Sequence, residues 1–194
     1  MKLLSKVKLV KADITKLKVD CIVNAANENL YGPKARKPFR GIAEAIRLVA
    51  GDELLEECKK VTRAGGCRTG KAVITGGYKL PAKHVIHAVG PQKSMHGINF
   101  DLLSSAYTSS LEVMRENDLR SIAFCCISTG LFGHPNEESA QVAFESVRDW
   151  VLNNWADVDE VTFCTWLDKD YDIYKELLGQ YEKTQAATKL DSMK

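Results

Sequence analysis

Six short apolar runs rich in β-branched residues constrain the fold of this 194-residue chain more than any other feature. They cover Val7–Lys11, Val19–Asn24, Lys71–Thr75, His84–Val89, Ser121–Ile127 and Glu160–Thr165. Several are continuously apolar, which is typical of strands covered on both faces. Between them, apolar residues recur at helical spacing near residues 42–49, 103–114 and 140–151. Alternating strands and helices predict an α/β fold, a three-layer α/β/α sandwich.

Composition excludes several classes of function. Lysine and arginine number 27 against 25 aspartate and glutamate, so a net charge of +2 favours neither nucleic-acid nor membrane binding. No apolar stretch approaches the ~20 residues that span a bilayer, and residues 1–11 are too short and too charged for a signal peptide. Six cysteines without CxxC or zinc spacing indicate reduced, buried thiols and no metal site. We therefore expect an intracellular protein, cytoplasmic or nuclear or both.

The length fits one domain, which we place at residues 1–183 and expect to be monomeric. The last stretch, residues 184–194, lacks an apolar stripe and is predicted to be a disordered tail.

Two patterns look catalytic but fit structural roles better. Residues 65–71 spell GxxxxGK, yet Ala72 stands where a phosphate-binding loop needs Ser or Thr, and the segment precedes a strand rather than a helix. His84 and His87 alternate with apolar residues on a predicted strand, which favours core or supporting positions. No GxSxG sequence indicates a serine hydrolase.

Three loops that leave predicted strands carry more unusual chemistry. In open α/β sheets, ligands bind beyond the carboxyl ends of the strands. The first loop, Asn24-Ala25-Ala26-Asn27, offers two amides with close backbone access, or it is a plain Asn-rich turn. The second, residues 128–133 (STGLFG), has backbone N–H groups that could cradle a diphosphate, or it is an ordinary strand-to-helix connection.

The third loop begins with Trp166, after the last predicted strand. An aromatic side chain there can stack on a purine base, or it forms a hydrophobic lid. Asp13, after the first strand, can accept a hydrogen bond from an exocyclic amino group and so select adenine, or it is a helix N-cap. Together the loops describe a base site, a diphosphate site and an amide-lined pocket for a second sugar, which is the shape of ADP-ribose.

These residues resemble the macrodomain family over nearly the whole chain, from Val7 to Tyr181. The likeness is closest to the MacroD-type mono-ADP-ribosyl hydrolases. It is carried by Ala12-Asp13-Ile14-Thr15, Val19–Asn27, Cys67–Ala72, Leu80–Lys83, Ile86–Pro91, Ile127–Gly133, Pro135–Glu137 and Phe163–Asp170. The resemblance implies a mixed, mostly parallel central sheet, ADP-ribose and mono-ADP-ribosylated proteins as partners, and no cofactor.

Carried over by position, the resemblance also implies roles for individual residues. Asp13 binds the adenine amino group, Ile14 bounds the base and Trp166 stacks on it. Asn27 holds the distal ribose beside the bond that is cut and is the expected catalytic residue. The remaining expected ligand contacts are Asn24, Gly41, Ile42, Ala43, Ser128, Thr129, Gly130, Leu131 and Phe132, of which Phe132 packs against the distal ribose.

The second phosphate loop departs from the family pattern. MacroD-type enzymes have a run of glycines, then an apolar residue, then an aspartate implicated in hydrolysis. Here a longer segment follows Gly32, and Ala43 stands in the place of the aspartate. Glu44 is the next carboxylate, but on a helix it points about 100° away from position 43.

The inserted segment is also chemically different from a glycine run. Pro33 and Pro38 remove N–H donors and stiffen the chain. Its cations either contact ligand phosphates or an anionic partner, or they line a solvated loop: Lys34, Arg36, Lys37 and Arg40.

The MacroD-type motifs, combined with the altered second phosphate loop, leave three possible functions. One is a hydrolase that removes mono-ADP-ribose from proteins or from O-acetyl-ADP-ribose-type esters, with Asn27 and the ligand phosphate placing the water. Another is a reader that binds ADP-ribose or ADP-ribosylated protein without turnover, which Ala43 favours because no obvious general base remains. A third is a pseudo-binder whose rebuilt loop has closed the site. The overall MacroD likeness favours the hydrolase.

Overall fold

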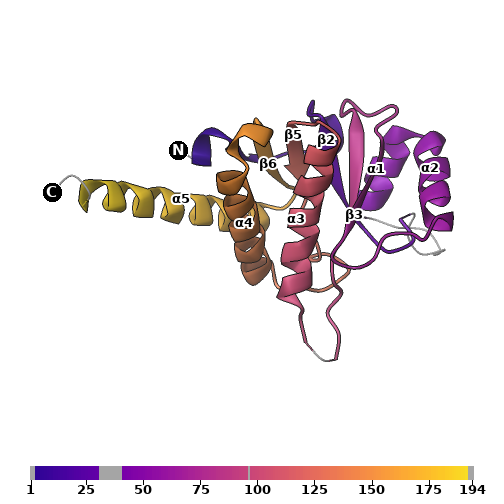
Figure 1. Ribbon diagram of the computed structural model, residues 1–194. Coiled ribbons are helices and arrows are strands. Elements are labelled where there is room, and N and C mark those ends of the chain that lie inside the picture. The colour runs from indigo at the N-terminus through magenta and orange to yellow at the C-terminus, as the bar shows by residue number, and fades with distance from the viewer. Residues whose placement is uncertain (1–2, 31–40, 96, 192–194) are drawn as a thin grey trace.

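The computed structural model describes residues 3–30, 41–95 and 97–191 (Figure 1). Its centre is a six-stranded sheet in the order β1-β6-β5-β2-β4-β3. The strands are β1 (Val7–Lys11), β2 (Cys21–Ala26), β3 (Ala72–Gly76), β4 (His84–Val89), β5 (Ser121–Phe124) and β6 (Glu160–Thr165). All neighbours pair in parallel except β3, which runs antiparallel to β4. The sheet is therefore mixed and mostly parallel, as expected.

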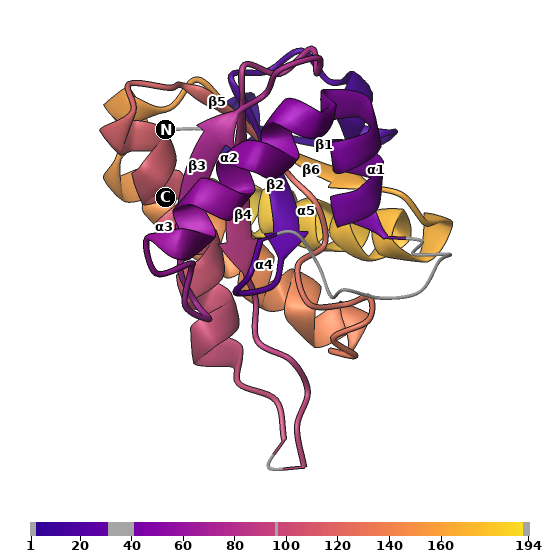
Figure 2. The ribbon, with the colours of Figure 1, turned by 90° about the vertical axis from the view of Figure 1, so that its right-hand side faces the viewer.

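Helices cover both faces of this sheet, which confirms the three-layer sandwich. They are α1 (Ile42–Ala50), α2 (Asp52–Arg63), α3 (Phe100–Glu116), α4 (Asn136–Asn153) and α5 (Asp168–Asp191). Helices α1 and α2 lie together on one face, nearest the viewer in Figure 2, while α3 and α4 pack side by side on the other. Short 3-10 turns precede β1 (Leu3–Ser5), follow it (Ile14–Lys16) and precede β6 (Trp155–Asp157).

A row of aromatic rings fixes α3 and α5 on the same face of the sheet. Tyr107 of α3 lies 5.1 Å from Phe124 of β5, Phe124 lies 6.4 Å from Phe163 of β6, and Phe163 stacks on Tyr174 of α5 at 4.6 Å, all between ring centroids. All four side chains are buried. Each such pair adds about 0.5–1.5 kcal/mol beyond its apolar burial. The row therefore anchors the start of α5 against the strands that position the candidate site.

Strand bounds agree with the sequence prediction where the apolar pattern is local. Strands β1, β4 and β6 have the predicted limits, and β3 is displaced by one residue. Strand β2 begins and ends two residues later than predicted, so Asn24 lies inside the strand and not in the loop after it. Strand β5 ends three residues early, at Phe124.

Helix α5 continues to Asp191, which differs from the disordered tail expected from Thr184 onward. Thr184 and Thr188 each donate a hydroxyl hydrogen bond to the carbonyl four residues earlier. Residues 182–188 are exposed, and Figure 1 shows this end of α5 extending away from the body. An apolar stripe is not needed for such a projecting segment, whereas its alanine, glutamine and lysine residues favour helix. Within the part of the chain described here, no helix has the length and hydropathy of a membrane span.

Asp20 ties together the amino ends of three parallel strands. Its carboxylate accepts hydrogen bonds from the backbone N–H groups of Arg120 and Ser121, each at 3.0 Å, and from the Ser121 hydroxyl at 2.9 Å. Lys83, just before β4, donates to it at 2.7 Å. Desolvation raises the pKa of Asp20, but the hydrogen bonds outweigh it and lower the pKa from 3.8 to about 2.

We expect Asp20→Asn to lower the free energy of unfolding by about 1–2 kcal/mol at neutral pH, allowing for solvent screening. Because the folded-state pKa of Asp20 is depressed, its contribution is present above pH 3.8 and is lost as the pH falls toward about 2. Urea unfolding of both proteins between pH 7 and pH 2 should therefore converge. Asp101→Asn, at an exposed carboxylate in the first turn of α3, is the control. A constant difference at every pH would contradict this role.

Candidate functional site

The carboxyl ends of five parallel strands form one edge of the sheet, and the predicted site residues follow them. Along this edge the order of strands is β1, β6, β5, β2 and β4. Asp13 follows β1, Trp166 follows β6, residues 125–135 follow β5, Asn27 follows β2 and Gly90 follows β4. Neighbouring strands lie about 4.8 Å apart, so β1 and β2 are separated by roughly 14 Å. The edge is long enough for an extended nucleotide diphosphate sugar.

Asp13 caps the 3-10 turn Ile14–Lys16. Its Oδ1 accepts hydrogen bonds from the Thr15 N–H at 3.0 Å and the Thr15 hydroxyl at 2.7 Å. Asp13 is thus an N-cap, as one of the two alternatives predicted. Both hydrogen bonds, however, are accepted by the same oxygen of the carboxylate. Ile14 is buried beside it, with 3% of its surface exposed. The cap fixes the side chain and leaves Oδ2 as a further acceptor.

Trp166 lies next to Asp13 along the edge. The last residue pair of the β1–β6 ladder is Lys11 and Thr165, and the Ala12 N–H continues it by donating to the Thr165 carbonyl at 3.1 Å. Trp166 follows immediately and is 72% exposed. A large aromatic side chain left this open beside a fixed carboxylate can stack on a planar ring.

Loop 125–135 curves tightly between β5 and α4. Ser128 adopts the left-handed conformation, with φ of 67°. The Gly133 N–H donates to the Gly130 carbonyl at 2.9 Å, and the His134 N–H donates to the Ser128 carbonyl at 3.0 Å. These bonds close the loop on itself.

The backbone N–H groups of residues 128–132 take no part in the hydrogen bonds that close the loop. Within the described residues, none of the five donates a hydrogen bond. The Ser128 hydroxyl is buried and likewise has no partner there. Consecutive free N–H groups on a curved backbone form an anion-binding concavity. The predicted diphosphate loop therefore has the donors that such a ligand needs.

Gly90 brings the end of β4 against this loop. A Cβ atom at Gly90 would lie 2.2 Å from Ser128 Oγ and 2.4 Å from Ile127 Cγ2. Further along the same segment, the Lys93 N–H donates to the Phe132 carbonyl at 2.8 Å. No local sequence pattern indicates this support.

Asn24 and Asn27 differ in their surroundings. Asn24 lies in β2 and is 2% exposed, and its Nδ2 is 3.1 Å from His87 Nδ1. Asn27 follows the strand and is partly exposed. The Oδ1 atoms of both side chains are buried and accept no hydrogen bond from the described residues. Two acceptors therefore remain near the end of β2.

The start of α1 also reaches this edge. Gly41 precedes the helix with an extended φ of −150°, and a Cβ there would meet nothing within 4 Å. Helix α1 packs on β2 and on the turn Ile14–Lys16, with Ile42 and Ala43 half-buried. Glu44 Oε2 is buried and has no partner among the described residues. The basic segment 33–40 and Gly32 lie outside the described residues.

His134, at the end of loop 125–135, is a buried histidine that no sequence pattern distinguishes. It is 3% exposed, packs edge-on against Phe100 at 5.9 Å between ring centroids, and neither ring nitrogen has a partner in the described chain. Burial, with the nearby charge of Lys93, lowers the pKa of His134. A neutral ring supports the base of the loop.

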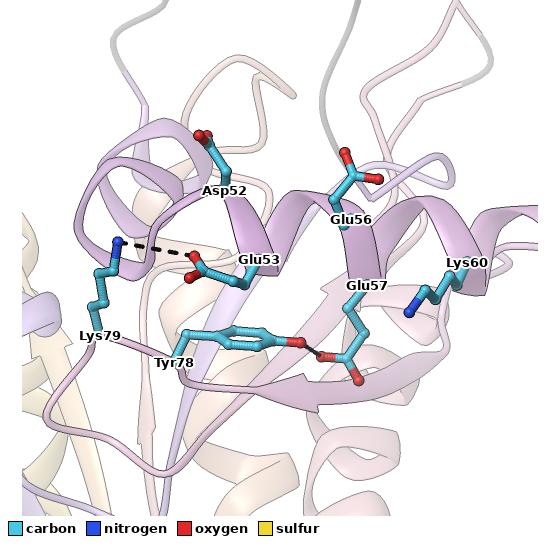
Figure 3. A pocket seen from close by; sticks show the side chains of 7 residues that line it. All are labelled: Asp52, Glu53, Glu56, Glu57, Lys60, Tyr78 and Lys79. Atoms are coloured by element: carbon cyan, nitrogen blue, oxygen red, sulfur yellow. Dashed lines mark hydrogen bonds and ion pairs between the residues drawn. The ribbon is translucent and has the colours of Figure 1, made fainter.

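A separate hollow lies at the opposite, amino-terminal edge of the parallel strands (Figure 3). Its charged side chains hold α2 against the end of β3 and the β3–β4 turn. Glu57 accepts hydrogen bonds from the Tyr78 hydroxyl at 2.7 Å and the Gly76 N–H at 2.9 Å, and the first of these raises the pKa of Tyr78 to about 12. The lining residues are Asp52, Glu53, Glu56, Glu57, Lys60, Tyr78 and Lys79. No group of histidine, cysteine and carboxylate side chains in the described residues could hold a metal ion.

Comparison with known proteins gives consistent matches. The family model described as Macro domain matches residues 23–143. The ADP-ribose glycohydrolase MACROD2 of Mus musculus is 44% identical over 196 residues, covering 96% of this chain and 39% of its own length. A Macro domain-containing protein of Chlorobaculum tepidum is 45% identical, covering 88% of this chain and 94% of its own length. The chain thus spans less than half of the mouse protein and nearly all of the bacterial one.

Solved structures agree with these relatives. The Trypanosoma brucei macrodomain in complex with ADP-ribose superposes with a TM-score of 0.82 at 35% identity, covering 91% of this chain and 70% of the other.

Proposed function

The chain belongs to the macro domain family, and on that premise we propose that it binds ADP-ribose and hydrolyses the bond between ADP-ribose and modified proteins or related esters. The observation that carries the proposal is the row of backbone N–H groups at residues 128–132, which donate to no other described residue and so offer a site for a diphosphate. Relatives named ADP-ribose glycohydrolases support the hydrolytic half.

The proposed ligand lies along the strand edge from β1 to β2. Adenine stacks on Trp166 with its amino group on Asp13 Oδ2, and Ile14 bounds the ring. The diphosphate lies on the loop of Ser128, Thr129, Gly130, Leu131 and Phe132, opposite Gly41, Ile42 and Ala43. The distal ribose reaches Asn27, with Asn24 beneath it. This order follows the order of the strands.

In the proposed reaction, a water oxygen bonds to the anomeric carbon of the distal ribose while the bond to the acceptor oxygen breaks. The water loses one proton as its oxygen bonds to the carbon and the departing oxygen gains one, so that free ADP-ribose and unmodified acceptor result. Asn27 and a ligand phosphate position the water, so orientation supplies most of the rate. Ala43 provides no carboxylate for this step, and that is the observation favouring the second candidate, a reader without turnover.

The test is release of free ADP-ribose from a mono-ADP-ribosylated acceptor protein, measured by chromatography. Multiple turnovers would support the hydrolase. Retention of the modified protein on the immobilised chain without release would establish the reader. Neither release nor retention would mean that the altered loop has closed the site.

Asp13→Asn should weaken ADP-ribose binding by about 1–3 kcal/mol, because the amide presents a donor where adenine also presents one. The remaining oxygen still caps Thr15, so the melting temperature should stay unchanged. Calorimetry with inosine diphosphate ribose, whose ring carries an acceptor at that position, should show the reverse preference. Unchanged affinity for both ligands would place adenine elsewhere.

A further inference from the structure

A network of buried, hydrogen-bonded polar side chains lies on the face of the sheet that α2 covers. His87 of β4 is the register partner of Asn24 on β2. His87 Nδ1 is 3.1 Å from Asn24 Nδ2, and His87 Nε2 is 2.9 Å from Thr75 Oγ1 on β3. Cys58 Sγ of α2 lies 3.7 Å from the same Nε2. All three strand residues are at most 2% exposed.

The donors and acceptors in this network define the direction in which each hydrogen bond is donated, from Asn24 through His87 to Thr75. With the Asn24 side-chain nitrogen facing the ring, His87 Nδ1 accepts a hydrogen bond and the ring proton is on Nε2. Thr75 Oγ1 accepts that proton in a hydrogen bond. Its own hydroxyl hydrogen has two carbonyl acceptors at 3.4 Å, those of Gly76 and Val85. Burial lowers the pKa of His87 to about 4, so the ring is neutral at physiological pH.

The direction of these hydrogen bonds determines which atom of the Asn24 amide remains without a partner. A ring proton on Nδ1 would instead favour the reversed amide, with its oxygen toward the ring, so the tautomer of His87 and the orientation of the Asn24 amide are set together. With the proton on Nε2 the oxygen points away from His87, and it is the atom that is buried without a partner in the described residues. Asn24 lies three residues before Asn27 on the same segment.

We propose that His87 is a positioning residue, which holds the Asn24 amide so that its oxygen accepts a hydrogen bond from a hydroxyl of the distal ribose. The proposal rests on the proposed binding of ADP-ribose. Thr75 sets the direction of the hydrogen bonds, because its hydroxyl oxygen stabilises the proton on His87 Nε2. Neither His87 nor Thr75 contacts the ligand in this scheme, and their effect reaches it through Asn24.

The matched variants are Thr75→Val, which removes the hydroxyl at nearly constant volume, and Thr75→Ser, which keeps it. Calorimetry would compare ADP-ribose with ADP, which lacks the distal ribose. Thr75→Val should lose about tenfold in ADP-ribose affinity, the worth of one hydrogen bond, and keep its ADP affinity. Thr75→Ser should match the wild type with both ligands.

Nitrogen-15 NMR of His87 in the wild-type protein gives a readout that needs no variant. A proton on Nε2 is expected, and a proton on Nδ1 would overturn the proposal. Equal losses for ADP-ribose and ADP in Thr75→Val, or no loss, would also overturn it. Absence of ADP-ribose binding by the wild-type protein would instead contradict the proposed function, with the NMR result still deciding the polarity.

Discussion

Replacing Asn27 by alanine is expected to lower the rate of ADP-ribose release by about 100-fold, the scale of losing one group that orients the reacting atoms. Adenine and diphosphate contacts lie on other strands, so affinity for ADP should not change. Asn27→Ala should also fold as well as the wild type. Its Oδ1 is buried without a hydrogen-bond partner in the described residues, and removing such a group breaks no internal bond.

This independence from folding makes the variant a clean test. Release would be measured under single-turnover conditions from a mono-ADP-ribosylated protein, beside a melting curve for each variant. Asn29→Ala is the matched control, since Asn29 is exposed two residues further on. Among the described residues, its one hydrogen bond uses the backbone carbonyl, which accepts from the Thr62 hydroxyl at 2.9 Å. Loss of release in both variants, or in neither, would remove Asn27 from the catalytic role.

Much of the fold could be predicted because the strand pattern is local. The apolar runs of β1, β4 and β6 end where polar residues begin, and their limits follow from sequence alone. The early end of β5 depends on a distant residue. The Ile127 N–H donates to Tyr107 Oη at 3.2 Å, and that hydroxyl donates to the Cys125 carbonyl at 3.4 Å, so this segment leaves the ladder.

Helix α2 was missed for a different reason. Its segment is dense in charge and its apolar residues are few, so the helix does not stand out as apolar even though those residues share one face. Leu54, Cys58 and Val61 do recur at helical spacing, with Leu54 and Cys58 buried and Val61 half-buried. Counting Cys58 as apolar would have revealed the helix, because free cysteines behave as small hydrophobic residues.

The site was predictable in its chemistry but not in its supports. Asp13, Trp166 and Asn27 each follow a strand, so topology alone places them at one edge. The supporting role of His87 depends on the register that sets it opposite Asn24, and no local pattern encodes that register. Sequence analysis could therefore place His87 in the interior without identifying the amide it holds.

Gly90 shows the same limit, and its replacement carries the second large prediction. We expect Gly90→Ala to lower the free energy of unfolding by about 1–3 kcal/mol, the usual cost of forcing extra volume into a packed site. The added Cβ would lie 2.2 Å from Ser128 Oγ and 2.4 Å from Ile127 Cγ2. Ser128 begins the row of N–H groups that donate to no other described residue, so ADP-ribose affinity should also fall, by about tenfold or more.

Gly130→Ala is the matched control within the same loop. A Cβ at Gly130 meets nothing within 4 Å, so the melting temperature of that variant should equal that of the wild type. Its ADP-ribose affinity should nevertheless fall, because the methyl group occupies the surface on which the diphosphate is proposed to lie. The two glycines thus separate support of the loop from contact with the ligand.

Coupling between Gly90 and Ser128 can be measured directly with a double-mutant cycle. Adding Ser128→Gly to Gly90→Ala removes the contact with Oγ and suits the φ of 67° at that position, while the contact with Ile127 remains. Urea unfolding of the four proteins should show that the second change recovers part of the lost stability. Additive effects, or a Gly90→Ala protein as stable and as tightly binding as the wild type, would show that the loop does not depend on this close approach.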